Sequence, residues 1–267
     1  NGVTAGVYEF DIGSAGSTMM VLQAALPALA RLPTASRLQI TGGTHNPMAP
    51  PYEFIVETLA PQLARIGWRC EFGLQRYGFV PAGGGVINVN IAPATAPTPL
   101  QLLDRGEFQR CDARVLIAHL QRSIAERELA ALQAALPWKH NGGGITQTRD
   151  SDGPGNMVSA HLHYEHVTEV VSALGERRRR GEDIAKQVAE EVRGFHSAPH
   201  AAPVGEYLCD QLLVPLAITG GGQFRSTTWS LHAESQREVI AKFLGVDVKV
   251  VHHDNDVVVT VPAAATP

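Results

Sequence analysis

The amino-acid sequence predicts an α/β (α+β) protein in which repeated βαβαββ units form a large domain, with a small α/β domain inserted between them. Three observations lead to this prediction. Segments with helical and with strand-like hydrophobic periods alternate along most of the chain. The order helix, strand, helix, strand, strand occurs in residues 17–91 and again in residues 204–261. Two linkers rich in Pro and Ala, at 92–99 and 196–203, enclose a segment with a different order of elements.

The first copy of the unit is predicted as a helix at 17–32, a strand at 36–41, a helix at 50–67 and strands at 68–78 and 86–91. Ser14 or Ser17 can cap the first helix, and Pro27 should kink or shorten it. Two prolines open the second helix, where they are tolerated. A triple glycine separates the last two strands, which indicates a turn whose backbone approaches another segment closely or adopts unusual angles.

The second copy is predicted as a helix at 204–218, a strand at 222–230, a helix at 232–245 and a final hairpin. In both copies a glutamine precedes a proline of the first helix by four residues, namely Gln23 before Pro27 and Gln211 before Pro215. These matches support an internal repeat. We therefore assign residues 1–91 and 199–267 to the large domain, as its first and its C-terminal repeat unit.

The segment between the linkers is predicted as a strand at 108–120, a helix at 123–136, two strands within 156–175 and a helix at 181–195. We assign it, as residues 92–198, to the inserted small α/β domain. His161 and His163 share one face of a strand there, but without cysteines or an HExxH helix a solvated face is favoured over a metal site. The basic run at 176–183 could touch RNA phosphate, although its acidic neighbours favour a solvated loop.

Composition narrows the classes of function. The formal net charge of −4 argues against a long nucleic-acid-binding tract, so a nucleic acid would be held locally, for example at one end. No apolar run approaches the roughly 20 residues of a membrane span, and no signal peptide is visible. Cys70, Cys111 and Cys209 form neither a CxxC pair nor a disulfide framework. We expect a reducing compartment, the cytoplasm, or the nucleus if the source is a eukaryote.

His232 is the first candidate for chemistry, because it stands between a Thr-rich strand and a helix. A histidine nucleophile can attack phosphorus to form a phosphoramidate, which divides one difficult transfer into two easier steps. The first turn of a helix also offers free N–H groups to a phosphate. The alternative, which the local pattern favours, is that His232 merely begins the helix beside Ser230 as its cap.

Tyr207 and Gln211 lie on one face of the predicted helix at 204–218, with Asp210 beside them. An aromatic ring, an amide and a carboxylate could hold the base and ribose of a nucleotide. The alternative is an ordinary polar stripe on an amphipathic helix, which the pattern alone favours.

Six stretches occur in one order across nearly the whole chain: GSAGSTMMVLQAALPAL (13–29), GGTHNPMAPPYEFI (42–55), YGFVPAGGG (77–85), DGPGN (152–156), VGEYLCDQLLVPLA (204–217) and LH (231–232). Together they resemble the RNA 3′-terminal phosphate cyclase family. The resemblance implies that ATP adenylylates His232, that AMP passes to an RNA 3′-phosphate, and that the 2′-hydroxyl then forms a 2′,3′-cyclic phosphate. It also implies a divalent metal, Mg²⁺ or Mn²⁺, whose ligands it does not identify. The nucleotide site that it implies draws on Gln23, Pro51, Tyr207, Asp210 and Gln211.

Two departures from the family pattern raise alternatives. Tyr77 stands where the family usually has a basic residue, and Arg76 precedes it. The family also opens with a further repeat that carries an acidic, glycine-rich loop and several arginines, and no such run occurs in these residues, so we expect a cyclase relative that lacks this N-terminal repeat. A truncated module that binds nucleotide or RNA without turnover is one alternative. A non-catalytic cyclase-like protein of ribosome assembly is another, against which His232 argues. The oligomeric state stays open.

Overall fold

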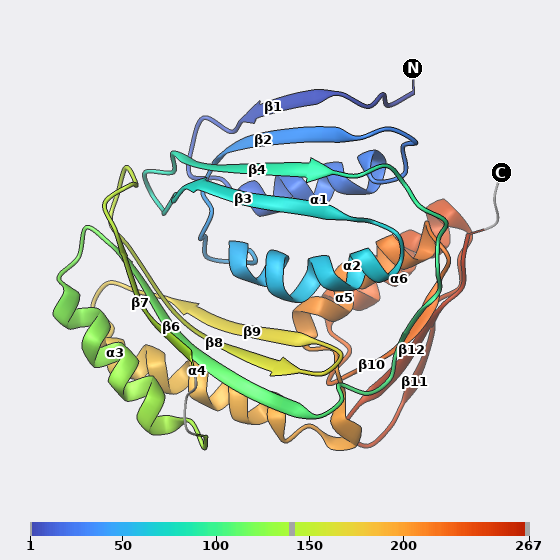
Figure 1. Ribbon diagram of the computed structural model, residues 1–267. Helices are drawn as coiled ribbons and strands as arrows, with labels where there is room; N and C mark the ends of the chain where they lie inside the picture. The colour runs from blue at the N-terminus through green and yellow to red at the C-terminus, as the bar shows by residue number, and fades with distance from the viewer. Residues whose placement is uncertain (1, 139–141, 265–267) are drawn as a thin grey trace.

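The computed structural model describes residues 2–138 and 142–264 of the chain. Within these residues the strands form three four-stranded sheets, and the fold is mixed α/β, as predicted. Figure 1 shows the N-terminal sheet along the top of the molecule, the C-terminal sheet at the right, and the sheet of the middle segment below and to the left. The helices of the first and last segments lie between the N-terminal sheet and the other two (Figure 1).

The first unit contains β1 (Val7–Asp11), α1 (Thr18–Leu29), β2 (Ser36–Gly42), the π-helical turn η1 (Phe54–Leu59), α2 (Ala60–Arg65), β3 (Cys70–Arg76) and β4 (Gly85–Ile91). Its strand order is β1-β2-β4-β3. Strand β1 pairs parallel with β2, and the other neighbours pair antiparallel. Helix α1 ends at Leu29, two residues beyond Pro27, so the proline acts close to the helix end.

The last unit contains β5 (Leu100–Leu102), α5 (Glu206–Ala217), β10 (Gly222–Ser226), α6 (Leu231–Leu244), β11 (Lys249–His252) and β12 (Val257–Val261). Its strand order is β5-β10-β12-β11, which repeats the order of the first sheet. The senses repeat as well, because β5 pairs parallel with β10 and the remaining pairs are antiparallel. Both units are therefore βαβαββ, which confirms the predicted repeat and adds a first strand to each copy.

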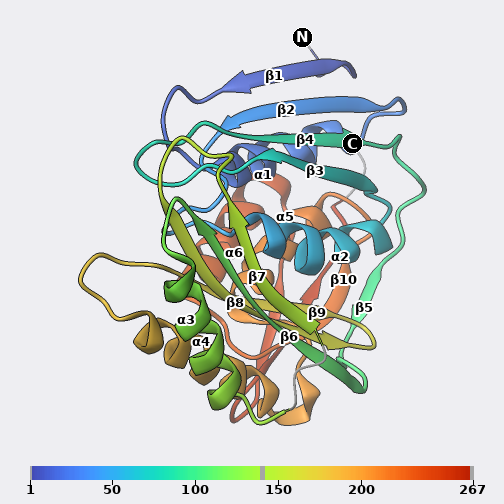
Figure 2. The same cartoon turned by 60° about the vertical axis from the view of Figure 1, so that its left-hand side comes forward.

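The middle segment contains β6 (Phe108–Ala118), α3 (Arg122–Ala135), β7 (Gly142–Thr148), β8 (Gly155–Tyr164), β9 (Thr168–Leu174) and α4 (Gly181–His196). The strand order is β7-β6-β8-β9. Helices α3 and α4 cover the outer face of this sheet, as Figures 1 and 2 show. A short 3₁₀ turn, η2 (Pro199–Ala201), leads back to the last unit.

Strand β5 bears on the division into domains, because it lies inside the range 92–198 predicted for the insertion but pairs with β10. Its pairing assigns it to the C-terminal sheet. We propose that the inserted domain runs from β6 to α4, and that the large domain consists of the two βαβαββ units.

A charged network joins the inner face of the inserted sheet to η1 of the first unit. Glu57 pairs with Arg114 at 2.7 Å and with His161 at 2.9 Å. His161 Nε2 lies 3.0 Å from Ser159 Oγ. Burial alone would raise the pKa of Glu57, but the hydrogen bond and charge of His161, together with Arg114, lower it to about 2. The solvated strand face predicted for His161 is wrong, because the large domain covers this face and His161 is fully buried.

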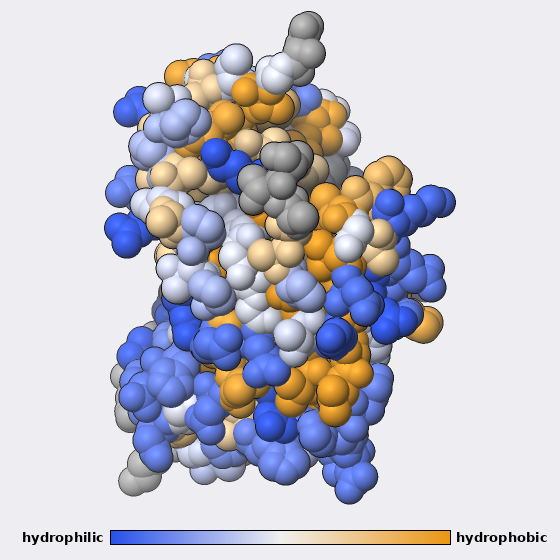
Figure 3. All heavy atoms as spheres, turned by 90° about the vertical axis from the view of Figure 1, so that its right-hand side faces the viewer, coloured by the Kyte–Doolittle hydropathy of each residue, from blue (hydrophilic) through white to orange (hydrophobic). Residues whose placement is uncertain are grey.

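The side of the molecule that carries α6 and β11 is only partly polar. Val239 and Phe243 of α6 and Val251 of β11 are exposed. Figure 3, which views this side, shows apolar patches among charged side chains. Within the described ranges, no helix combines the length and apolar character that crossing a membrane requires.

Glu169 is a buried carboxyl group on β9 that the fold leaves incompletely paired. It is 5% exposed, and its Oε2 has no hydrogen-bond partner among the described residues. The carboxyl faces Gly205, the residue that begins α5, so it lies where the inserted sheet meets the large domain. Burial raises the pKa of Glu169 to about 8. The folded protein therefore holds this proton at neutral pH, whereas the unfolded chain releases it.

Glu169→Gln tests this assignment. Because the folded pKa of about 8 is above the ordinary glutamate pKa of 4.5, stability should fall as the pH rises between these values. The slope is at most about 1.4 kcal/mol per pH unit. We expect the variant to unfold at the same temperature as the wild type near pH 4.5, and at a higher temperature than the wild type near pH 8. Thermal unfolding followed by circular dichroism at both pH values measures this; an equal difference at both would contradict it.

Candidate active site

Four loops that are distant in sequence meet beside the start of α1. They are residues 13–17, 42–46, 77–85 and 152–156. Gly43 N donates to Gly16 O at 2.7 Å, and Thr18 N donates to Gly43 O at 2.8 Å. The Asn46 amide donates to the carbonyl of Ala15. These bonds hold the second loop against the first and against the N-terminus of α1.

Glycines permit this convergence because the backbones touch where a side chain would not fit. A Cβ at Gly43 would lie 2.5 Å from the carbonyl oxygen of Ala15. One at Gly78 would lie 2.6 Å from Gly85 N, across the glycine-rich hairpin. Gly83 has a φ of +71°, a conformation that other residues rarely adopt. The triple glycine therefore serves close backbone approach, as predicted from the sequence.

A largely buried relay of polar side chains, formed by Thr44, His45 and Glu53, contacts the glycine-rich hairpin. Thr44 Oγ1 accepts from Gly78 N at 3.0 Å and lies 2.8 Å from His45 Nδ1. His45 Nε2 lies 3.0 Å from Glu53 Oε2. Burial opposes ionisation of Glu53, but the charge and hydrogen bond of His45 outweigh it and lower the pKa of Glu53. Sequence reasoning missed this relay; the polar pair Thr44-His45 beside two glycines was the available signal.

Arg76 and Tyr77 are neighbours in sequence but have different partners. Arg76 Nη2 pairs with Asp152 at 2.5 Å, and Arg76 Nε pairs with Asp150 at 3.3 Å. The ring of Tyr77 instead packs against His45, with ring centroids 5.7 Å apart. The cation of Arg76 therefore fastens the loop at 152–156, which belongs to the inserted domain, to the hairpin of the first unit.

Most of the predicted nucleotide-site residues lie on α1 and α5, and α5 packs beside α6. The amide of Gln23 on α1 donates to the side-chain oxygen of Gln211 on α5. Tyr207 and Asp210 lie on the same face of α5, and the Tyr207 side chain is 64% exposed. No hydrogen bond or ion pair of the described residues joins Pro51 to this group; its carbonyl accepts from Ile55 N at 3.3 Å, at the start of the helical segment.

His232 is exposed and is the second residue of α6. Ser230 caps this helix, since its hydroxyl accepts from Ala233 N at 3.1 Å, so His232 is free of that role. Burial raises the pKa of Asp210 to about 6, and the charge of His232 opposes this rise. The two side chains are therefore electrostatic neighbours, across the contact between α5 and α6.

Helix α1 connects the two groups. Ser17 caps its N-terminus, as predicted, by accepting from Met20 N at 3.3 Å. Gln23 lies six residues farther along, a rise of roughly 9 Å. The converging loops therefore lie at the start of α1, and the Gln23–Gln211 pair lies farther along the same helix.

The residues present do not form a complete protein site for a divalent metal. Among residues 2–138 and 142–264, no three His, Cys, Asp or Glu side chains converge as ligands. Mg²⁺ is commonly held by one or two carboxylates together with substrate phosphates. We derive no chemical step through a metal from this geometry.

Gly155→Ala tests the contact between the inserted domain and the hairpin. A Cβ at Gly155 would overlap the ring of Phe79, which is buried in the hairpin. We expect the variant to lose about 1–3 kcal/mol of unfolding free energy, as overpacking of a core does. Gly194→Ala, in open space on α4, is the control and should be neutral or stabilising. Urea unfolding measures both, and equal stability of the two variants would contradict the contact.

Comparison with known proteins agrees with this arrangement. The model of the family described as RNA 3′-terminal phosphate cyclase matches residues 1–250. A protein of Koribacter versatilis (strain Ellin345) named RNA 3′-terminal phosphate cyclase is 39% identical over 253 residues, which are 95% of this chain and 71% of that relative. The glycine-rich loops, the repeated units and these matches lead to one conclusion: the chain belongs to the RNA 3′-terminal phosphate cyclase family.

Proposed function

We propose that this chain converts an RNA 3′-terminal phosphate to a 2′,3′-cyclic phosphate at the expense of ATP, with His232 as the nucleophile that carries AMP. The observation that supports this most directly is the position of His232. Its side chain is exposed on the first turn of α6. Ser230, and not His232, caps this helix, and Asp210 is an electrostatic neighbour of the imidazole. Membership of the cyclase family supports the same reaction class.

The proposed reaction has three balanced steps. A ring nitrogen of His232 attacks the α-phosphorus of ATP, the bond to pyrophosphate breaks, and the imidazole proton passes to solvent. An oxygen of the RNA 3′-phosphate then attacks the same phosphorus, the N–P bond breaks, and the histidine is free again. Finally the 2′-hydroxyl of the same nucleotide attacks the activated 3′-phosphorus, its proton passes to solvent, the bond to AMP breaks and AMP leaves. The last nucleophile is held next to its target by the ribose itself, so proximity favours ring closure.

The neighbours of His232 take roles that suit their chemistry. The exposed ring of Tyr207 offers a stacking surface for adenine. Gln23 and Gln211 present amides beside it, and Pro51 is the fifth residue that we assign to the nucleotide site. The first-turn N–H groups of α6 can stabilise a phosphate oxygen. Asp210 orients the imidazole or holds a ribose hydroxyl.

The remaining partners follow from this reaction. ATP and an RNA end that carries a 3′-phosphate are the substrates, and we include Mg²⁺ or Mn²⁺ in the assay because ATP is used with a divalent cation in such transfers. We propose the cytoplasm as the site of action, or the nucleus in a eukaryote. A ribosome-assembly role without catalysis and a binding module without turnover are outcomes that the first experiment separates from the enzyme.

His232→Ala is the decisive variant. We expect wild-type protein incubated with α-labelled ATP and Mg²⁺ or Mn²⁺ to acquire acid-labile, base-stable label, and His232→Ala to acquire none while melting at the wild-type temperature. His253→Ala removes another exposed histidine and should label normally. Label that persists in His232→Ala would exclude His232 as the nucleophile. No label on the wild type, with ATP still bound, would support the binding module instead.

Asp210→Asn tests the electrostatic neighbour. Burial raises the pKa of Asp210 to about 6 from 3.8, so the wild type should lose stability as the pH rises between these values. The variant should therefore gain thermal stability over the wild type across that interval. It should also label more slowly at neutral pH and lose the inflection near the Asp210 pKa in its pH–rate profile. A labelling profile with the same inflection as the wild type would show that Asp210 does not act on His232.

A further inference from the structure

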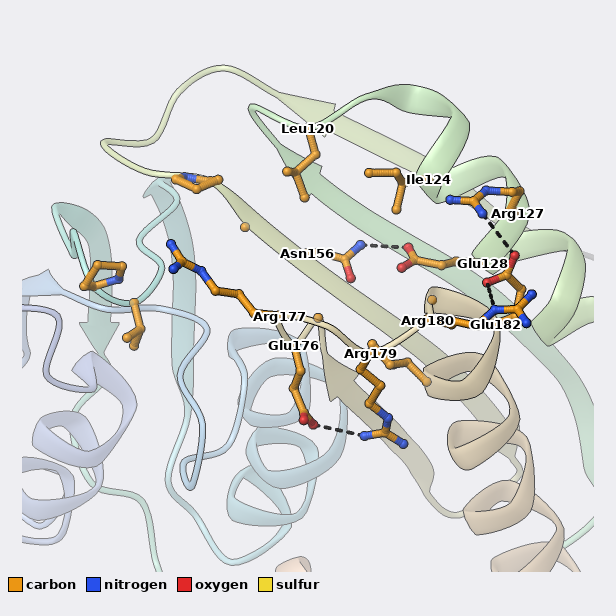
Figure 4. Close-up of a pocket in the computed structure, with 17 residues that line it drawn as sticks. Leu120, Ile124, Arg127, Glu128, Asn156, Glu176, Arg177, Arg179, Arg180 and Glu182 are labelled. Atoms are coloured by element: carbon orange, nitrogen blue, oxygen red, sulfur yellow. Dashed lines mark hydrogen bonds and ion pairs between the residues drawn. The ribbon is translucent and has the colours of Figure 1, made fainter.

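A cavity of about 490 Å³ lies on the inserted domain, between α3, the start of α4 and the loop at 175–180 that joins β9 to α4. Its volume is within the range of about 300–1,000 Å³ typical of ligand sites. Figure 4 shows Asn156 and Glu128 at its centre, with Arg127 and Glu182 at one end and Arg177 toward the other. The loop itself projects from the molecule (Figure 2). Nothing in the proposed reaction uses this cavity.

The charge of the cavity wall is positive on balance. Four arginines line it, at positions 127, 177, 179 and 180. Glu182 is shared by Arg127 at 3.2 Å and Arg180 at 3.8 Å, and Glu176 pairs with Arg179 at 3.0 Å. The third carboxyl, Glu128, is 2% exposed and accepts from the Asn156 amide at 2.7 Å. Surface carboxylates thus leave part of the guanidinium charge unmatched.

Arg177 carries the unmatched charge most clearly. It is exposed, and within the described ranges it has no ion pair or hydrogen bond. Figure 4 shows its side chain extending along the cavity, away from Arg127 and Arg180. Arg178, the next residue, is also exposed and also unpaired among the described residues, but it does not line the cavity. An exposed guanidinium without a protein partner can form two parallel hydrogen bonds to one phosphate group.

The cavity continues toward the converging loops of the active site. A smaller cavity of about 90 Å³, lined by His45 and Phe79, shares Val80, Pro154, Gly155, Asn156 and Gly175 with the larger one. The two therefore form one groove, which begins at the buried relay of the second loop and ends at the arginines. An RNA strand that passes the converging loops would therefore enter this groove.

We propose that this groove binds the phosphodiester backbone of the RNA strand leading to the reacting 3′ end, with Arg177 as a direct phosphate contact. The inference rests on the proposed function, because it takes the substrate to be RNA. A positively charged groove that follows a backbone is the usual means of holding a single strand without reading its sequence. It also explains how a chain with a net charge of −4 holds a polyanion, since the positive charge is concentrated in one place.

The test compares Arg177→Glu with Arg178→Glu, which change the net charge equally. Binding of a fluorescent single-stranded RNA of about 12 nucleotides with a 3′-phosphate is measured by anisotropy over a range of salt concentrations, beside binding of a trinucleotide. We expect Arg177→Glu to weaken the longer RNA roughly tenfold at low salt and to make the salt dependence shallower by about 0.7 in log–log slope. Arg178→Glu should stay within about twofold of the wild type, and the trinucleotide should bind all three proteins alike.

Several outcomes would overturn the inference: equal weakening by both variants, weakening by neither, an equal effect on the trinucleotide, or no RNA binding by the wild type. Labelling by α-labelled ATP separates this result from the proposed function. Protein that labels at His232 but binds long RNA independently of Arg177 refutes the groove alone. Protein that never labels, yet binds long RNA through Arg177, refutes the reaction and keeps the groove.

Discussion

The structure depends on close backbone contact between glycines at the start of α1. Gly43 N donates a hydrogen bond to Gly16 O there, and Gly78 and Gly85 touch across the hairpin at distances that admit no side chain. These contacts bring three loops of the first unit to the end of one helix, and the Arg76–Asp152 pair adds a loop of the inserted domain. A side chain at any of these positions would separate the loops by ångströms, and positioning at that scale determines the rate of phosphoryl transfer.

Helix α1 extends this constraint to the proposed nucleotide site. Gln23 and Gln211 occupy equivalent positions in the two βαβαββ units, and they bond to each other across the pseudo-symmetric pair of helices α1 and α5. The repeat therefore places the same residue type at the contact from both sides. His232 lies near the same helix pair, because α6 packs beside α5 and presents its capped first turn next to Asp210.

The inserted domain is attached by charge rather than by apolar packing alone. Arg114 and His161, on the inner face of the inserted sheet, pair with Glu57 of the first unit. Asp152, in a loop of the inserted domain, pairs with Arg76 of the first unit. Both arginine pairs are partly exposed, so solvent screens their attraction and they fix geometry more than they add stability. The same attachment places the arginine-lined groove in line with the converging loops, so the position of the insertion and its proposed use are connected.

The sequence by itself determined the fold class, the repeat and the residues that identify the family, because hydrophobic period and glycine-rich motifs are local properties of the chain. It did not reveal β1, β5 and β7, and each of these strands is the edge of its sheet. Each of these three strands is also short or largely exposed, so its residues lack the sustained apolar and polar alternation by which the other strands were predicted. Tertiary structure alone decided that His161 is the buried partner of Glu57 and that Gln23 meets Gln211, since these contacts join segments far apart in sequence. Pairing at such distances depends on how the units pack, which no local pattern encodes.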